Sequence, residues 1–218
     1  ILSKSKLINQ FNQLKEIGLK VSYSYKTNRE VGKLLQELPE TKDCEYSIHA
    51  KQEIQDIKDK SKIWFFTQAE SEDELKELLN KNIINFVIDN QIDLQRLLNT
   101  IKQTQTKINL SLRMKFKENR IGSGKYFVYG MPSKIVNELI AQLKDNQLIN
   151  NLGVHIHRKS QNTSEWEIKQ ELKDSLTKET LQRINFLNFG GGLPIKYRSY
   201  TSNVQPYIFS KIQESIDC

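Results

Sequence analysis

Residues 184–194 read Ile184-Asn185-Phe186-Leu187-Asn188-Phe189-Gly190-Gly191-Gly192-Leu193-Pro194. An apolar run typical of a β-strand ends here in three residues without side chains. The backbone can therefore turn sharply and present its N–H groups to an anion such as phosphate. A plain turn before Leu-Pro is the alternative. The chain has nine glycines in 218 residues, and three of them together behind a strand favour a binding loop.

Candidate strands and helices alternate through the rest of the sequence. Apolar runs predict seven strands, at residues 19–25, 44–48, 63–66, 84–88, 108–114, 152–157 and 185–189. Helical periodicity predicts helices at residues 1–18, 30–38, from 51, 72–79, 94–101, 133–143, 166–181 and 204–215. Strands that alternate with helices, without hairpin signals, predict an α/β fold with a parallel sheet and crossover helices.

Seven such units favour a (β/α)8 TIM-type barrel in which seven of the eight strands lie in this chain. An open doubly wound sheet is the alternative, but its glycine-rich turn normally follows the first strand rather than the seventh. We therefore expect residues 1–218 to form one barrel domain that is incomplete at its C-terminal end. Active sites of such barrels lie at the carboxyl ends of the strands, and phosphate is commonly held after strands seven and eight.

Composition limits the kinds of partner. Lys and Arg number 33 against 26 Asp and Glu, a net charge of +7, but the two signs are interleaved, as in residues 70–77. Without a basic stripe that carries aromatic residues, we expect no nucleic-acid partner. The absence of a long apolar run predicts a soluble protein without a membrane-spanning helix. Cys44 and Cys218 lie too far apart to suggest a disulfide framework or a metal site, which fits the cytoplasm.

Two further residues are expected at the same mouth of the barrel as the glycines. Lys26 follows the first strand and His157 ends the sixth. A lysine that is tuned toward its neutral amine can form a Schiff base with a carbonyl compound. An imidazole can lie flat against a planar ring, and a glycine loop can bind phosphate. Together these groups meet the requirements of pyridoxal 5'-phosphate.

Three motifs resemble the fold type III pyridoxal-phosphate decarboxylases, which include the ornithine, arginine and diaminopimelate enzymes. Tyr23-Ser24-Tyr25-Lys26-Thr27-Asn28 is similar to their tyrosine-x-x-lysine-x-asparagine run. Gly153-Val154-His155-Ile156-His157-Arg158-Lys159-Ser160-Gln161 resembles their Gly-Leu-His-x-His-Ile-Gly-Ser-Gln segment, and Leu187-Asn188-Phe189-Gly190-Gly191-Gly192 resembles their Leu-Asp-Ile-Gly-Gly-Gly. The order and spacing of the motifs fit the family, and the resemblance implies an alanine racemase-like barrel over nearly the whole chain.

The resemblance also implies roles for individual residues. Lys26 would be the Schiff-base lysine and His157 the histidine that stacks on the cofactor ring, and these two are the expected catalytic residues. The expected cofactor-binding residues are Lys26, Glu53, Arg113, His157, Ser160, Gly190, Gly191 and Gly192. Tyr129-Gly130 echoes the family's Phe-Gly after its mobile loop. Without the family, Arg113 could be a surface or ion-pair residue and Glu53 a solvated helix residue. We expect His155 to be structural, because neighbouring strand residues point in opposite directions.

The chain departs from the family at three positions. Ser47 and Asn188 stand where the family has aspartate, and Lys159 stands where it has glycine. The family's Glu-Pro-Gly-Arg strand is absent from this sequence, as are the cysteine, aspartate and tyrosine of its β-domain. That glutamate keeps the pyridine ring protonated. We therefore expect this chain to need a complementary polypeptide that supplies strand eight and the β-domain, in a homodimer or a heteromeric assembly.

The expected function is the decarboxylation of a small amino acid by a pyridoxal-phosphate-dependent carboxy-lyase. The pair Ser160-Gln161 favours the diaminopimelate branch, in which meso-diaminopimelate becomes L-lysine in lysine biosynthesis. An ornithine- or arginine-type decarboxylase is one alternative. A catalytically inactive relative that acts as a regulatory or partner subunit is another, because of Ser47, Lys159 and Asn188.

Overall fold

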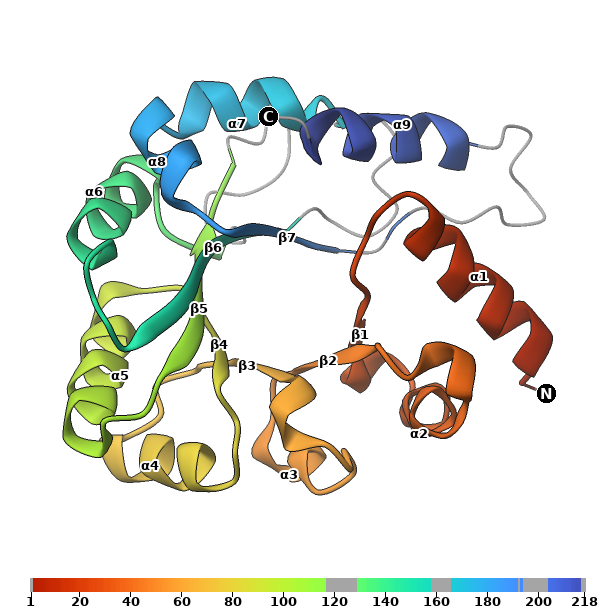
Figure 1. Ribbon diagram of the computed structural model, residues 1–218, viewed down its shortest axis with the longest axis horizontal. Helices are drawn as coiled ribbons and strands as arrows, with labels where there is room; N and C mark the ends of the chain where they lie inside the picture. The colour runs from red at the N-terminus through yellow and green to blue at the C-terminus, as the bar shows by residue number, and fades with distance from the viewer. Residues whose placement is uncertain (1, 117–128, 158–165, 192, 194–203, 217–218) are drawn as a thin grey trace. The chain divides into compact units, whose positions relative to one another are not determined.

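The computed structural model describes residues 2–116, 129–157, 166–191, 193 and 204–216. The chain divides into two compact units, Ile1–Asn109 and Leu110–Cys218. Strands and helices alternate in chain order within each unit (Figure 1). The strands follow one another across one sheet in the order β1 to β7. A doubly wound sheet would reverse its strand order, so this order confirms the predicted α/β fold of the TIM-barrel type.

The first unit holds four strands. Its elements are α1 (Lys4–Glu16), β1 (Ser22–Ser24), the 3-10 turn η1 (Tyr25–Thr27), α2 (Arg29–Glu37), η2 (Pro39–Thr41), β2 (Glu45–Ile48), α3 (Lys51–Ile54), η3 (Lys60–Lys62), β3 (Ile63–Phe66), α4 (Glu72–Asn80), β4 (Asn85–Ile88) and α5 (Gln91–Thr104). The pairs β1–β2, β2–β3 and β3–β4 are all parallel. Parallel pairing places the carboxyl ends of β1 to β4 at one edge of the sheet.

The core of the first unit forms around β3 and β4, in which every residue is buried. Phe65 and Phe86 are fully buried and are register partners. Leu75 of α4 and Leu97 of α5 are also buried, and the two helices contact each other. A strand that is buried on both faces gives a continuous apolar run in the sequence, which explains why both strands were recognisable.

The second unit holds the other three strands. Its elements are β5 (Ile108–Met114), which begins at the boundary, α6 (Ser133–Leu143), β6 (Ile149–His157), α7 (Ile168–Ser175), α8 (Lys178–Arg183), β7 (Phe186–Gly190) and α9 (Gln205–Ile216). β6 and β7 are parallel over five register pairs, from Gly153↔Phe186 to His157↔Gly190. α9 packs against α7 and buries Ile208 and Ile212.

One predicted element is wrong: the helix expected over residues 166–181 is two helices. α7 ends at Ser175, and Leu176 is extended, with φ −106° and ψ 138°. The Thr177 hydroxyl accepts a hydrogen bond of 3.2 Å from the Thr180 N–H and so caps α8. In a continuous helix that N–H would donate to the carbonyl of Leu176. The cap therefore replaces a backbone bond that the apolar periodicity alone had implied.

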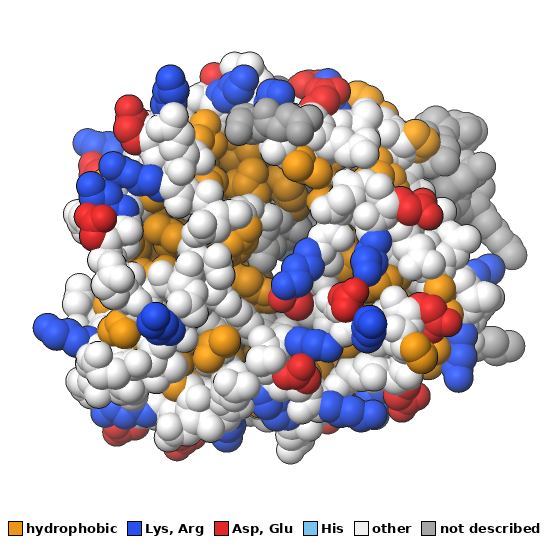
Figure 2. Space-filling view, in the orientation of Figure 1, with side chains coloured by type: hydrophobic (Ala, Val, Ile, Leu, Met, Phe, Trp, Pro, Cys, Tyr) orange, Lys and Arg blue, Asp and Glu red, His pale blue; other side chains and the backbone are white. Residues whose placement is uncertain are grey.

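Charged side chains of both signs lie among one another on the surface that Figure 2 shows. Several form ion pairs within the first unit, among them Lys15–Asp43 and Lys51–Glu74. Within the described residues, no helix has both the length and the apolar character needed to cross a membrane.

Candidate functional site

Lys26 lies in η1, immediately after β1, and its side chain is exposed. The adjacent Tyr25 points the other way and is fully buried. Its ring meets the ring of Tyr46 edge to face, with centroids 6.4 Å apart and planes at 78°. Burial, together with the Asp56 carboxylate, raises the pKa of Tyr25 to about 12. The buried tyrosine thus anchors the turn from which Lys26 projects.

The other residues of the lysine motif hold the same turn. The Tyr23 hydroxyl donates to the Asn28 carbonyl at 3.1 Å. The Asn28 side chain caps α2 by accepting from the N–H groups of Glu30, at 3.0 Å, and Val31, at 3.3 Å. The spacing tyrosine-x-x-lysine-x-asparagine therefore describes a strand end, a projecting lysine and a helix cap that are joined by hydrogen bonds.

Glu53 lies in α3, after β2, and is only 4% exposed. Its Oε2 is buried and has no hydrogen-bond partner among the described residues. The alternative of a solvated helix residue is therefore wrong. A buried carboxyl oxygen without a partner is costly and calls for a specific reason, of which a water, an ion or a ligand that supplies the missing hydrogen bond is one.

Ser47, one of the departures from the family, lies on β2. Its hydroxyl is 2.9 Å from the hydroxyl of Ser22 on β1. This contact links β2 to β1, the strand that precedes Lys26. The serine at position 47 therefore makes a hydrogen bond to its neighbouring strand, although it lacks the carboxylate of the family's aspartate.

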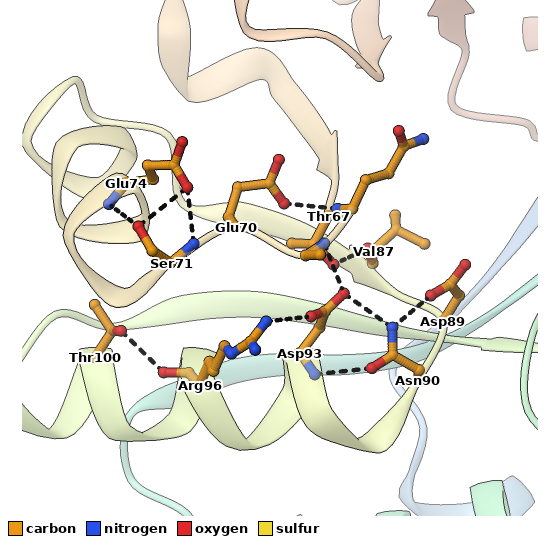
Figure 3. Close-up of polar contacts among 12 residues, drawn as sticks. Thr67, Glu70, Ser71, Glu74, Val87, Asp89, Asn90, Asp93, Arg96 and Thr100 are labelled. Atoms are coloured by element: carbon orange, nitrogen blue, oxygen red, sulfur yellow. Dashed lines mark hydrogen bonds and ion pairs between the residues drawn. The ribbon is translucent and has the colours of Figure 1, made fainter.

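The loop between β3 and α4 lies at the same sheet edge as Lys26 and is held from α5 (Figure 3). Ala69 has a positive φ of 64°, and its N–H donates to Asp93 Oδ2 at 3.1 Å. Asp93 is 5% exposed. It also accepts from Asn90 Nδ2 at 2.9 Å and pairs with Arg96 at 3.3 Å. These bonds satisfy a buried carboxylate inside the protein, so we assign it a structural role.

His157 ends β6 and is exposed, whereas His155 is 2% exposed. Their ring centroids are 6.1 Å apart, and both rings lie beside Gly190 of β7. The reason given for a structural His155, that neighbouring strand residues point in opposite directions, therefore does not separate it from His157. Side chains alternate between the faces of a strand, so residues two apart share a face.

Gly190 ends β7, directly opposite His157. A Cβ at this position would lie 2.4 Å from Cε1 of His155 and 2.8 Å from Nδ1 of His157. Gly191 has a φ of +116°, a conformation that residues with side chains rarely adopt. Close packing at Gly190 and the positive φ of Gly191 thus each explain why glycine is needed at that position. Gly192 and Ser160 lie outside the described residues.

Arg113 is the penultimate residue of β5 and is half-buried. Its guanidinium carbon lies 5.4 Å from the centroid of the Tyr129 ring, within the range of a cation–π contact. Gly130 has a φ of +107°, and a Cβ there would lie 2.9 Å from the Arg113 carbonyl oxygen. The Tyr129-Gly130 pair therefore packs directly on the expected cofactor-binding arginine.

The structure thus places Lys26 and Glu53 in the first unit, and Arg113, His157, Gly190 and Gly191 in the second. Sequence reasoning missed the position of His155, although its spacing of two from His157 was the available signal. It also missed Ser111, a fully buried serine two residues before Arg113 whose Oγ has no hydrogen-bond partner among the described residues. Among the residues that the structure describes, no group of three or more His, Cys, Asp or Glu is placed so that it could hold a metal ion.

A family model matches residues 4–218, and its description is "Pyridoxal-dependent decarboxylase, pyridoxal binding domain". One curated protein that matches is a bifunctional aspartokinase/homoserine dehydrogenase of Buchnera aphidicola subsp. Acyrthosiphon pisum (strain APS). It is 26% identical over 145 residues, which are 60% of this chain and 17% of that protein. Because the chain spans so little of that relative at this identity, the match shows no shared family.

Several solved structures resemble this chain in fold. Lysine decarboxylase from Selenomonas ruminantium is 17% identical, with a TM-score of 0.73, and the match covers 98% of this chain and 57% of that one. Diaminopimelate decarboxylase from Helicobacter pylori, complexed with L-lysine, is 21% identical, with a TM-score of 0.72 and coverages of 97% and 58%. The arginine decarboxylase of Paramecium bursaria Chlorella virus is 18% identical, with a TM-score of 0.68 and coverages of 97% and 58%. This chain therefore spans somewhat more than half the length of each.

Proposed function

The chain belongs to the family of pyridoxal-dependent decarboxylases, and on this premise we propose that residues 1–218 form the cofactor-binding barrel domain of an amino-acid decarboxylase. The family's cofactor is pyridoxal 5'-phosphate. One observation supports the proposal most strongly: Gly190 of the triple glycine packs directly against His157. Two motifs that are distant in the sequence are thus neighbours, as a shared site for a ring and its phosphate requires.

The residues present fit this cofactor. An exposed lysine can reach a carbonyl group, and Lys26 projects from a turn that is anchored on both sides. Gly190 and Gly191 at the end of β7 carry no side chain that would keep a phosphate from their backbone. The unpartnered Oε2 of Glu53 is an acceptor that still lacks a donor among the described residues.

Each residue then has a role. Lys26 supplies the amine that holds the cofactor covalently, and His157 offers a flat imidazole against one face of the ring. The backbone of Gly190, Gly191 and Gly192, together with Ser160, binds the phosphate. Arg113 contributes a positive charge near the ring, and Glu53 contributes a carboxyl oxygen. When bound, the cofactor supplies the electron sink that decarboxylation needs.

We propose meso-diaminopimelate as the substrate and L-lysine as the product, in the cytoplasm. Support comes from Ser160-Gln161, which follows the diaminopimelate branch, and from the fold likeness to a diaminopimelate decarboxylase complexed with L-lysine. Lysine and arginine decarboxylases have similar folds, so the test below compares their substrates as well as ornithine.

Turnover is proposed to need groups outside residues 1–218, because this chain spans only 57–58% of the decarboxylases compared above. A strand with Glu-Pro-Gly-Arg and a β-domain would supply them, on a complementary polypeptide or on further residues of the same one. The working assembly would be a homodimer or a heteromeric complex.

The test uses the protein purified from its source together with whatever accompanies it. Equal concentrations of meso-diaminopimelate, lysine, ornithine and arginine are supplied, and carbon dioxide release is measured. We expect the highest kcat/KM with meso-diaminopimelate and loss of release in Lys26→Ala. Unchanged turnover in Lys26→Ala would contradict the proposal. Cofactor binding without release from any substrate would instead favour the inactive partner subunit.

A further inference from the structure

His155 is a buried residue to which the proposed function assigns no role. It lies on β6 two residues before His157, on the same face, and is opposite Asn188 in the β6–β7 register. The ring-stacking role belongs to the exposed His157. His155 nevertheless contacts the same glycine, because both rings approach Gly190.

Of the two imidazoles beside Gly190, that of His155 lies nearer to the position a Cβ would take. A Cβ added to Gly190 would lie 2.4 Å from Cε1 and 2.8 Å from Nε2 of His155, against 2.8 Å from Nδ1 of His157. Atoms do not approach a Cβ within 3.0 Å, so the two imidazoles together fill the space that a side chain would need. Packed interiors transmit such contacts rigidly, because they contain few voids.

The same strand pair contains a second contact of this kind, in the opposite direction. A Cβ added to Gly153 of β6 would lie 2.6 Å from the Phe186 ring of β7, and these two residues are also register partners. β6 thus receives a ring from β7 at its middle, and β7 receives two rings from β6 at its carboxyl end. The two contacts together lock the register of the strands that carry His157 and the glycine turn.

We propose that His155 is a positioning residue of the site. It sets the distance between the glycine end of β7 and the ring of His157, and so places the phosphate-binding backbone at the correct height beside the ring-stacking imidazole. The inference rests on the proposed function, since it concerns binding of the same cofactor. Removal of the imidazole leaves space beneath Gly190, into which the strand end or the His157 ring can shift.

The test measures pyridoxal phosphate affinity and the visible circular dichroism of the bound cofactor in the full protein. His155→Ala should weaken affinity about 10- to 100-fold, as loss of a supporting partner does in metal sites, and should change the dichroism. His155→Phe, which keeps a planar ring, should retain more affinity than His155→Ala. This second variant also covers the case in which the alanine variant fails to fold.

A double variant tests the contact itself. Gly190→Ala should weaken cofactor binding, and His155→Ala added to it should restore part of the loss, because the nearest clashing atom is gone. The matched control is Gly153→Ala, whose clash is with Phe186, so that His155→Ala should not rescue it. Wild-type affinity and dichroism in His155→Ala, or equal loss in Gly190→Ala with and without His155, would overturn this inference alone. A wild-type protein that binds no pyridoxal phosphate would overturn the proposed function as well.

Discussion

Lys26 is presented by its neighbours rather than by its own contacts. Tyr25 is buried beneath the turn. Asn28 caps α2 with its side chain and accepts from the Tyr23 hydroxyl of β1 with its carbonyl. The amine is thus carried on a short segment that is held at both ends. We therefore expect substitutions at these neighbouring residues to lower the free energy of unfolding and to weaken the proposed binding of the cofactor at Lys26.

Replacement of Asn28 tests this coupling. Asn28→Ala removes the acceptor for the N–H groups of Glu30 and Val31, and loss of such a cap costs about 1 kcal/mol. We expect a lower free energy of unfolding in urea and weaker binding of pyridoxal phosphate. Asn28→Asp keeps an acceptor and should restore both quantities. If Asn28→Ala had the same free energy of unfolding as wild type, the cap would not hold the turn.

Gly32 of α2 tests the anchor on the other side of the turn. A Cβ there would lie 2.4 Å from Cε2 of Tyr25, and overpacking of this kind costs about 1–3 kcal/mol. Alanine gains about 1 kcal/mol in helix propensity, so we expect Gly32→Ala to lose about 0–2 kcal/mol net in urea unfolding. The exposed neighbour Lys33→Ala should stay within about 0.5 kcal/mol of wild type. A stabilised Gly32→Ala variant would mean that the Tyr25 ring is free to move.

Among the elements, the loop after β3 depends on a side chain from another helix. Asp93 of α5 accepts from the Ala69 N–H, whose residue has a positive φ, and from Asn90. Figure 3 shows these bonds converging on one carboxylate. The loop conformation therefore depends on a long-range contact to α5 in addition to local hydrogen bonds such as that from the Gln68 N–H to the Glu70 carboxylate.

Asp93→Ala should destabilise the protein by about 1–3 kcal/mol, because buried donors lose their acceptor. Urea unfolding measures the change. Asp73→Ala provides the control, since the Asp73 side chain is 92% exposed in its ion pair with Lys76 and should change stability by less than about 0.5 kcal/mol. Equal effects of the two variants would contradict the structural role of Asp93.

The N-terminus of α4 gives a pH-dependent contribution. Its capping box joins Ser71 and Glu74. The Lys51 ammonium, and then the Ser71 N–H and hydroxyl, lower the pKa of Glu74 from 4.5 to about 2. A folded-state pKa below the unfolded one contributes stability above pH 4.5, and the contribution is lost as the pH falls toward 2. The stability difference between wild type and Glu74→Gln should therefore shrink over this interval in urea unfolding. A difference that stays constant down to pH 2 would contradict the Lys51 contact.

For the whole molecule, strand order and most elements could be predicted from the sequence. β3, β5 and α6 agree with prediction residue for residue, because continuous apolar runs and clear helical periodicity mark them. The break between α7 and α8 could not be predicted, because apolar spacing continues across Leu176 while the Thr177 cap is a local hydrogen bond.

The residues of the candidate site could be proposed from motifs, but the contacts between them could not. Motifs predicted Lys26, His157 and the glycines as site residues, and these roles stay predictions. The burial of Glu53 and the close contact of His155 with Gly190 depend on packing. No periodic pattern in the sequence reports how near two strands bring their side chains. Residues Ser160 and Gly192 remain predictions, as does the meeting of Lys26 with His157 around one cofactor.

The most direct test of the central claim is to trap the cofactor on the protein. The holoprotein is reduced with borohydride and digested, and the peptide that carries the pyridoxyl group is identified by mass spectrometry. We predict that the group lies on Lys26, the residue that directly follows Tyr23-Ser24-Tyr25. A pyridoxyl group on a different lysine, or tight cofactor binding with no trapped adduct, would contradict the account.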